Sequence, residues 1–307
     1  MEPKCNLIID TCCDLPASFV ETEGVYVLKF PYIDGEHECL DDFYQSVSAK
    51  EFYDSMREGA QPHTAQLPVP AVQDAFRWAH EQGKPAVYLG FSSGLSGTFD
   101  SVCLLIEQMK EEIPDLDVTL VDTKKASIPQ GLLTYEAFRQ RKNGLTAAEL
   151  AAWVEEARFF IDEYFMVEDL EALHRGGRIP ASVAAAGSKL DVKPLLTIDT
   201  EGTLSLSGVA RGRKKGLKAL VEYWKKHRSE EAGGIIITGN ADCPKDTERL
   251  TELIKKEDES AVVVEASVGP VIGSHVGPGM IAICFWSQDT RDGRSLSDKI
   301  ADKVRSN

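Results

Sequence analysis

The sequence lacks the short motifs by which many nucleotide-dependent and metal-dependent enzymes are identified. Its 307 residues contain no G-x-x-x-x-G-K-[ST] loop, no G-x-G-x-x-G after a strand-like segment and no H-E-x-x-H pair. These absences argue against a P-loop ATPase, a standard dinucleotide-binding domain and a zincin-type protease. The nearest approach to a nucleophile elbow, Gly94-Leu95-Ser96-Gly97, has no glycine two places after the serine, so it does not match G-x-S-x-G.

Cysteine pairs and long apolar runs are also missing. The seven cysteines are scattered without a C-x-x-C pair, which gives no signal for a zinc knuckle or a thioredoxin-like site. No apolar run reaches the roughly 18 residues of a membrane span, and the first residues contain no signal-peptide apolar region. We therefore expect a cytoplasmic protein with reduced thiols, no metal site and no cofactor.

Positive charge is scarce in the chain as a whole. Lys and Arg total 34 against 49 Asp and Glu, so the formal net charge is -15. A chain this acidic is a poor non-specific ligand for nucleic acid, and we expect at most transient contact with an anionic membrane. The exception is the segment 211–228, in which lysines and arginines are dense.

Short apolar runs alternate with amphipathic helical patterns. Strands are expected at 7–9, 25–32, 86–91 and 118–121, and helices at 41–57, 68–82, 98–112, 130–142 and 146–160. This alternation predicts a parallel sheet covered by helices. In the second half, 194–199 and 203–208 are expected to form a hairpin, so the second sheet is expected to be mixed. We predict an α/β protein with an N-terminal domain over 1–160, a second α/β domain over 161–286 and a tail over 287–307.

The segment Phe91 to Thr98 follows an expected buried strand and opens an expected helix. Such a junction offers unpaired backbone N–H groups and the positive end of the helix dipole. Glycines allow close backbone approach, and hydroxyl groups add hydrogen-bond donors. The sequence therefore predicts a carboxylate or phosphate site here, made by Ser93, Ser96, Gly97 and Thr98. The alternative is a simple helix N-cap provided by Ser96 or Thr98.

Other polar residues are weaker candidates. Thr64 precedes another expected helix as an N-cap or a second hydroxyl donor. His275 lies in a segment rich in Gly and Pro, 269–279, which we expect to be a loop, and it is either a site residue or a structural hydrogen-bonding group. Arg178 ends a flexible Arg-Gly-Gly-Arg turn and suits an anion. Arg211, Arg213, Lys214 and Lys215 form either a docking patch or a solvated helix face.

Carboxylates also follow two expected strands, at Asp10 and at Asp122. We expect them to organise the loops at the sheet edge rather than to perform chemistry.

Taken in order, these segments resemble the DegV family of bacterial fatty-acid-binding proteins, from about residue 7 to about residue 286. The family's S-S-x-L-S-G-T is intact as residues 92–98, and its H-x-G-P-G is intact as residues 275–279. Further motifs appear at 10–15, 64–67, 122–127, 170–179, 193–196 and 211–215. Among the departures, Ala65 stands where the family usually has serine and Leu67 where it has proline, and Cys12 and Cys13 alter the first motif.

The resemblance implies a DegV-like two-domain fold that buries one long-chain fatty acid in an apolar tunnel. It implies that Thr64 and Ser96 hold the carboxylate and that His275 lies beside it. It further implies a partner, an ATP-dependent fatty acid kinase of the dihydroxyacetone-kinase type, which converts the bound carboxylate to an acyl phosphate. The segment 211–215 and Arg178 would then face that kinase or the new phosphate.

Three functions remain to be compared. The first is a non-catalytic fatty-acid carrier that presents its ligand to the kinase. The second is an acyl hydrolase with Ser96 as nucleophile and His275 as base, against which the incomplete elbow motif argues. The third is a binding module for another amphiphilic acid without a kinase partner.

Overall fold

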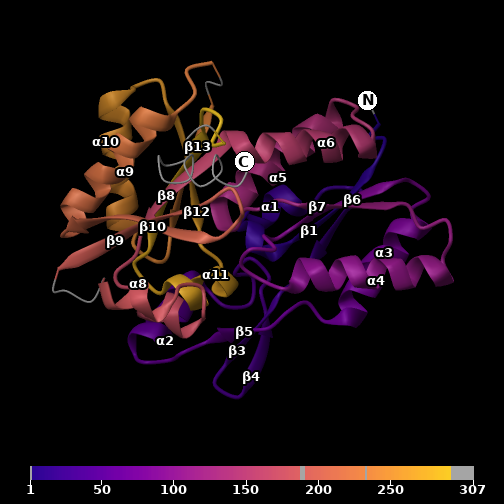
Figure 1. The fold of residues 1–307 in the computed structure, drawn as a ribbon, viewed down its shortest axis with the longest axis horizontal. Coiled ribbons are helices and arrows are strands. Elements are labelled where there is room, and N and C mark those ends of the chain that lie inside the picture. The colour runs from indigo at the N-terminus through magenta and orange to yellow at the C-terminus, as the bar shows by residue number, and fades with distance from the viewer. Residues whose placement is uncertain (1, 187–190, 232–233, 292–307) are drawn as a thin grey trace, which may run out of the picture.

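A computed structural model describes residues 2–186, 191–231 and 234–291 of the chain. In this part the strands form three sheets, and the two larger ones lie side by side in Figure 1. The first sheet has the order β2-β1-β6-β7 with every pair parallel. Its strands are β1 Asn6–Asp10, β2 Val25–Leu28, β6 Ala86–Gly90 and β7 Val118–Asp122.

The second sheet is mixed, with the order β10-β9-β8-β13-β11-β12. Only β11 and β12 pair in parallel, and the other neighbours are antiparallel. Its strands are β8 Ile161–Met166, β9 Val192–Ile198, β10 Leu204–Arg211, β11 Ile235–Asn240, β12 Val262–Ser267 and β13 Ile281–Trp286. A small antiparallel sheet, β4-β3-β5, is formed by β3 Pro31–Asp34, β4 His37–Leu40 and β5 His63–Thr64.

Helices cover both larger sheets, with α3 and α4 beside the first sheet and α9 and α10 beside the second (Figure 1). Two short 3-10 helices are η1 Thr11–Cys13 and η2 Arg158–Phe160. The α-helices are α1 Ala17–Val20, α2 Ala49–Arg57, α3 Val69–Glu81, α4 Thr98–Glu112, α5 Ser127–Lys142, α6 Ala147–Ala157, α7 Glu171–Arg175, α8 Ala181–Ala186, α9 Arg213–His227, α10 Pro244–Glu257 and α11 Pro270–Val276.

The predicted fold class is confirmed. Every residue of β1 and β6 is buried, as expected for parallel strands that are covered on both faces. The predicted hairpin forms as β9 and β10. The main hydrophobic core runs through both halves, and a smaller core beneath α9 and α10 belongs to the second sheet. The domain boundaries stay a prediction, and within the predicted tail residues 292–307 lie outside the described part.

Three local predictions are wrong. The helix expected from residue 41 begins only at Ala49, because Ser48 and Glu51 form a capping box there, while Phe43 and Tyr44 have positive φ. The strand expected over 25–32 divides into β2 and β3, which belong to different sheets. The expected loop 269–279 contains α11, because Pro270 occupies its first turn and Gly277, at φ +74°, ends it.

The carboxylates of the last residues of β1 and β7, Asp10 and Asp122, organise the sheet edge, as expected. Asp10 accepts hydrogen bonds from the backbone N–H of Phe91 at 2.8 Å and from the Gln130 amide at 3.0 Å. Asp122 accepts from the N–H of Ser93 at 3.2 Å and of Lys124 at 3.0 Å. These bonds fix the loops that face the second sheet.

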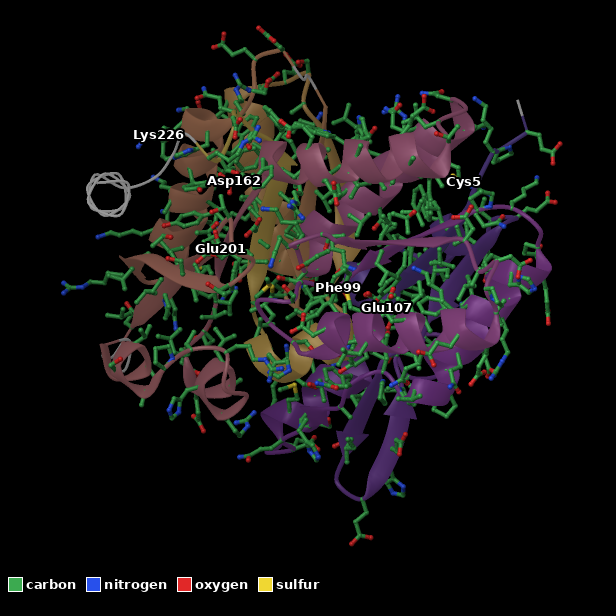
Figure 2. The ribbon with its side chains drawn as sticks, turned by 45° about the vertical axis from the view of Figure 1, so that its right-hand side comes forward. Cys5, Phe99, Glu107, Asp162, Glu201 and Lys226 are labelled. Atoms are coloured by element: carbon green, nitrogen blue, oxygen red, sulfur yellow. The ribbon has the colours of Figure 1, made fainter. Side chains whose placement is uncertain are left out.

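Contacts between distant segments join these loops to the second half. The Ser92 hydroxyl donates to the carbonyl of Gly202 at 2.8 Å, in the turn between β9 and β10 where Glu201 is labelled in Figure 2. Asp14 accepts from the N–H of Gly269, just before α11, at 2.9 Å. The first contact ties the loop after β6 to the β9–β10 turn, and the second ties the loop after β1 to the start of α11.

Candidate functional site

A cavity of about 150 Å³ lies between the loops of the first half and the face of the second sheet. Its walls include a residue from the segment after each parallel strand of the first sheet: Cys12 after β1, Phe30 after β2, Phe91 after β6 and Ala126 after β7. This is the carboxyl edge of an α/β sheet, where ligands of such folds generally bind.

The cavity wall is largely apolar. The remaining larger apolar residues on it are Leu95, Ile128, Phe165, Leu173, Ile198, Leu204, Val271, Ile272, Val276 and Met280. The polar residues on it are Thr64, Gln66, Ser96, Ser127, Glu163, Arg178 and His275. An apolar chamber with a few localised polar groups suits an amphiphilic ligand.

Thr64 and His275 meet at this cavity, although 211 residues separate them. The hydroxyl Oγ1 of Thr64, on β5, lies 2.9 Å from Nε2 of His275, on α11. Burial, followed by the positive charges of Arg178 and Arg175, lowers the pKa of His275 to about 4. The imidazole is therefore neutral near pH 7 and acts through hydrogen bonds rather than through charge.

The space around His275 leaves no room for a side chain at residue 176. A Cβ on Gly176 would lie 2.2 Å from His275 Nδ1. In the described structure Nδ1 has no hydrogen-bond partner. The ring is thus held between the Thr64 hydroxyl and the backbone of the turn that follows α7.

The segment 91–98 has the predicted strand-to-helix geometry, but its hydroxyl groups point to different partners. Ser96 and Gly97 line the cavity directly before α4, which has 15 residues. Ser96 Oγ lies 3.0 Å from Thr98 Oγ1 and accepts from the Thr98 N–H at 3.2 Å. Thr98 is buried, as the first residue of α4. The N-cap of α4 is Gly97, which makes no side-chain capping hydrogen bond, so neither Ser96 nor Thr98 is the N-cap of the alternative interpretation.

Ser93 is directed away from this group. Its hydroxyl accepts from Lys124 Nζ at 2.7 Å, and Ser93 is not among the cavity residues. The structure thus brings Thr64, Ser96, Gly97 and His275 to one cavity, with Thr98 adjacent and Ser93 outside it.

Arg178 connects the two halves at the edge of the cavity. Its Nε donates to the carbonyl of Leu95 at 3.0 Å, in the loop before α4, and its Nη1 donates to the carbonyl of Gly176. Burial lowers the pKa of Arg178 from its usual value, but an arginine remains charged near neutral pH. The site therefore contains one guanidinium beside the neutral hydroxyl and imidazole groups.

The basic segment lies at the end of β10 and the start of α9. Arg211, Lys214 and Lys215 are exposed, and no ion pair to them is found in the described part of the chain. Arg213 differs, because its guanidinium donates to Asp246 at 2.6 Å, to Glu168 at 2.9 Å and to the carbonyl of Gly279 at 2.8 Å. Arg213 therefore has a structural role in addition to any contact with a partner.

Sequence reasoning missed Glu163 and Lys125. Glu163 lines the cavity, and its Oε2 lies 3.4 Å from Lys125 Nζ, with both side chains almost fully buried. The adjacent acids Asp162 and Glu163 at the start of a strand-like segment that continues as Tyr-Phe-Met are the signal that could have drawn attention to it.

A nucleophile–base pair of the kind that a serine hydrolase needs is not formed by the described residues. The hydrogen-bond partner of His275 Nε2 is Thr64, and that of Ser96 Oγ is Thr98. A hydrolase requires the base within hydrogen-bonding reach of the nucleophile. The arrangement favours holding a ligand over the acyl-hydrolase alternative.

Membrane-spanning helices and metal-binding clusters are both absent from the described residues. No helix there is long and apolar enough to cross a bilayer. No cluster of three or more His, Cys, Asp or Glu side chains there could hold a metal ion.

Comparison with known proteins gives the family. The family profile described as "Uncharacterised protein, DegV family" matches residues 4–288. A DegV domain-containing protein of Clostridium perfringens is 36% identical over 289 residues, which cover 94% of this chain and 99% of the relative. The chain therefore belongs to the DegV family.

Solved structures of the family have the same fold. A DegV family protein from Thermus thermophilus, described as binding fatty acid, is 28% identical and superposes with a TM-score of 0.80 over 93% of this chain and 100% of its own. A fatty-acid-binding DegV family protein from Streptococcus agalactiae is 27% identical, also with a TM-score of 0.80, over 93% of this chain and 99% of its own.

Proposed function

We propose that the protein binds one long-chain fatty acid, with the acyl chain in the apolar cavity and the carboxylate at the Thr64–Ser96–His275 end. The observation that carries the proposal is the cavity itself, whose wall is apolar except for localised polar groups. Relatives described as fatty-acid-binding support it. About 15 methylenes buried at roughly 0.8 kcal/mol each would contribute about 12 kcal/mol before the costs of association are subtracted.

The head-group contacts follow from the geometry. The hydroxyl groups of Thr64 and Ser96 can donate to a carboxylate, and the N-terminal N–H groups of α4 beside Gly97 add further donors. His275 holds the Thr64 hydroxyl in place. Hydrogen bonds of this kind avoid leaving a desolvated carboxylate without partners.

The second part of the proposal is a kinase partner. Neutral donors leave a carboxylate oxygen nucleophilic toward ATP, and Arg178 is positioned to meet the additional charge of an acyl phosphate. The exposed Arg211, Lys214 and Lys215 would contact the separate ATP-dependent kinase. In this proposal the protein is a non-catalytic carrier in the cytoplasm.

Lipid binding is tested with delipidated protein and hexadecanoic acid in a calorimetric titration. We expect saturable binding at one site per chain. Absence of binding to any acid in a series from decanoic to octadecanoic acid would exclude the carrier function. Tight binding of a retinoid-like or sterol-like acid, with no binding of fatty acids, would instead support the third function, a binding module for another amphiphilic acid.

The kinase contact is tested by charge reversal at exposed positions. Lys214→Glu combined with Lys215→Glu is expected to reduce acyl-phosphate formation by an added dihydroxyacetone-kinase-type enzyme and ATP, while fatty-acid binding is retained. A matched control is Lys226→Glu combined with Lys256→Glu, which makes the same charge change elsewhere; Lys226 lies near the far end of α9 and is labelled in Figure 2. If acyl phosphate is formed at the same rate with both double variants, the basic segment is not the contact surface for the kinase.

A further inference from the structure

The wall of the cavity far from His275 is formed by Glu163. Met280, directly before β13, and Ala282, on β13, line the cavity, and Met280 is the nearer of the two to α11 in sequence. Ala282 pairs with Phe165 on β8, and the next residue on the same face, Cys284, pairs with Glu163. Because each two-residue step along a strand is roughly 6.5 Å, Glu163 lies deeper than Phe165, opposite the proposed head-group end.

The side chain of Glu163 faces the cavity side of the second sheet. Successive strand residues point to opposite faces, and Phe165 shares the face of Glu163. The neighbouring Asp162, labelled in Figure 2, lies on the other face and accepts from the Tyr223 hydroxyl at 2.8 Å. The buried charge at the deep end is therefore that of Glu163 and its partner Lys125.

In this buried pair the ammonium group has fewer partners than the carboxylate. Glu163 accepts from the N–H of Ile198 and from the Thr197 hydroxyl at 3.4 Å, and it lies 3.4 Å from Lys125 Nζ, with side-chain exposures of 2% for Glu163 and 5% for Lys125. An ammonium group has three N–H donors, yet within the described residues Lys125 Nζ has Glu163 as its one hydrogen-bond partner. Burial raises the pKa of Glu163 to about 7, against the opposing effect of Lys125. Polar groups left without partners in a buried site are costly.

The chemistry of this end does not match the terminal methyl group of a plain fatty acid. A methyl group placed against the pair would exclude water and supply no hydrogen bond. A hydroxyl group can donate to the Glu163 carboxylate, and Glu163 is the member of the pair that lines the cavity. A second carboxylate would instead be repelled by Glu163.

We propose that the preferred ligand is a hydroxylated fatty acid, whose hydroxyl group lies toward the far end of the acyl chain at the Lys125–Glu163 pair and donates to Glu163. This inference rests on the proposed fatty-acid function and adds the chemical class of the acyl chain. The carboxylate end is unchanged, so the same Thr64, Ser96 and His275 contacts apply to hydroxylated and plain chains alike.

The test compares octadecanoic acid with its 3-hydroxy, 12-hydroxy and 18-hydroxy derivatives in competition titrations on the delipidated full chain. We expect the 12-hydroxy or the 18-hydroxy acid to bind about tenfold more tightly than octadecanoic acid, as one hydrogen bond to a charged group allows. The 3-hydroxy acid, whose hydroxyl stays near the head group, serves as the positional control and is expected to show no such gain.

The double variant Lys125→Met/Glu163→Leu assigns the preference to the pair. It removes both charges together, so no unpaired charge is left buried. We expect it to bind octadecanoic acid at least as tightly as the wild type and to lose the preference for the hydroxylated acids. Lys125→Met combined with Glu163→Gln, which keeps a hydrogen-bonding side chain and also leaves no buried charge, is expected to retain part of the preference and serves if the first double variant does not fold.

The outcomes separate the two proposals. If the wild type binds octadecanoic acid and all three derivatives equally, the fatty-acid function stands and the hydroxyl inference is overturned. A preference that persists in the first double variant would also overturn the assignment to Glu163 and Lys125. If no acid in the series binds, the fatty-acid function fails, and the inference fails with it.

Discussion

Replacing Thr64 with Val isolates one hydroxyl group of the proposed carboxylate site. Thr64 lies on the two-residue strand β5, where it pairs with Tyr32 of β3. Valine has nearly the same shape as threonine and is equally suited to a strand. The substitution therefore removes the hydroxyl and little else.

The expected loss of affinity can be worked out from the contacts. A hydrogen bond to a charged group is worth about 1.5–3 kcal/mol, which corresponds to a loss of binding of about 10- to 150-fold. His275 Nε2, at 2.9 Å from the Thr64 hydroxyl, also loses its partner. For the unliganded protein we expect a decrease of about 1 kcal/mol in the free energy of unfolding.

The assay is a calorimetric titration of delipidated protein with hexadecanoic acid, together with urea denaturation. The matched control is Thr119→Val, the same change on strand β7 at a half-buried residue outside the cavity. Unchanged affinity in Thr64→Val would refute the head-group assignment. An equal loss in both variants would show that the effect is not specific to the site.

Three further variants test neighbouring parts of the reasoning. Gly176→Ala places a Cβ 2.2 Å from His275 Nδ1, so we expect the affinity for hexadecanoic acid to fall at least tenfold in the same titration. Unchanged affinity would contradict the described packing of His275 against residue 176. Ser96→Ala should weaken binding about tenfold, whereas Ser93→Ala, whose hydroxyl accepts from Lys124, should change it less than twofold; the reverse order would place the carboxylate elsewhere. Asp41→Asn tests the pH dependence of stability. Burial raises the folded-state pKa of Asp41 to about 7, so its contribution to stability, complete below about pH 4, is lost as the pH rises through 7. The free energy of unfolding, measured with urea at pH 5 and at pH 8, should decrease less between the two pH values in Asp41→Asn than in the wild type. Equal decreases would contradict the assignment of this pH dependence to Asp41.

The architecture of the first sheet was predictable because its signals are local. Apolar runs that end at Asp10, Gly90 and Asp122 become β1, β6 and β7, and the hydroxyl-rich segment after β6 opens α4 as expected. The helix predicted over 41–57 was wrong in its start, because the apolar spacing was considered without the capping signal inside the same segment. The apolar spacing over 41–57 resembled a helix, but the Ser48 capping box sets the helix start after it.

The candidate site was harder to predict because its contacts join distant parts of the chain. No spacing rule connects Thr64 with His275 or Asp14 with Gly269, which are 211 and 255 residues apart. The family resemblance supplied the first of these associations, and the residues alone left it open. The Lys125–Glu163 pair was missed, because no spacing rule connects two charges that are 38 residues apart in the sequence.

Native mass spectrometry of the purified full chain measures directly whether the protein carries a fatty acid. We expect one long-chain carboxylic acid per molecule, which is released on denaturation, and we expect Thr64→Val to reduce its occupancy. A purified chain with no bound acid, which also forms no complex after incubation with a mixture of plain and hydroxylated fatty acids, would contradict the account.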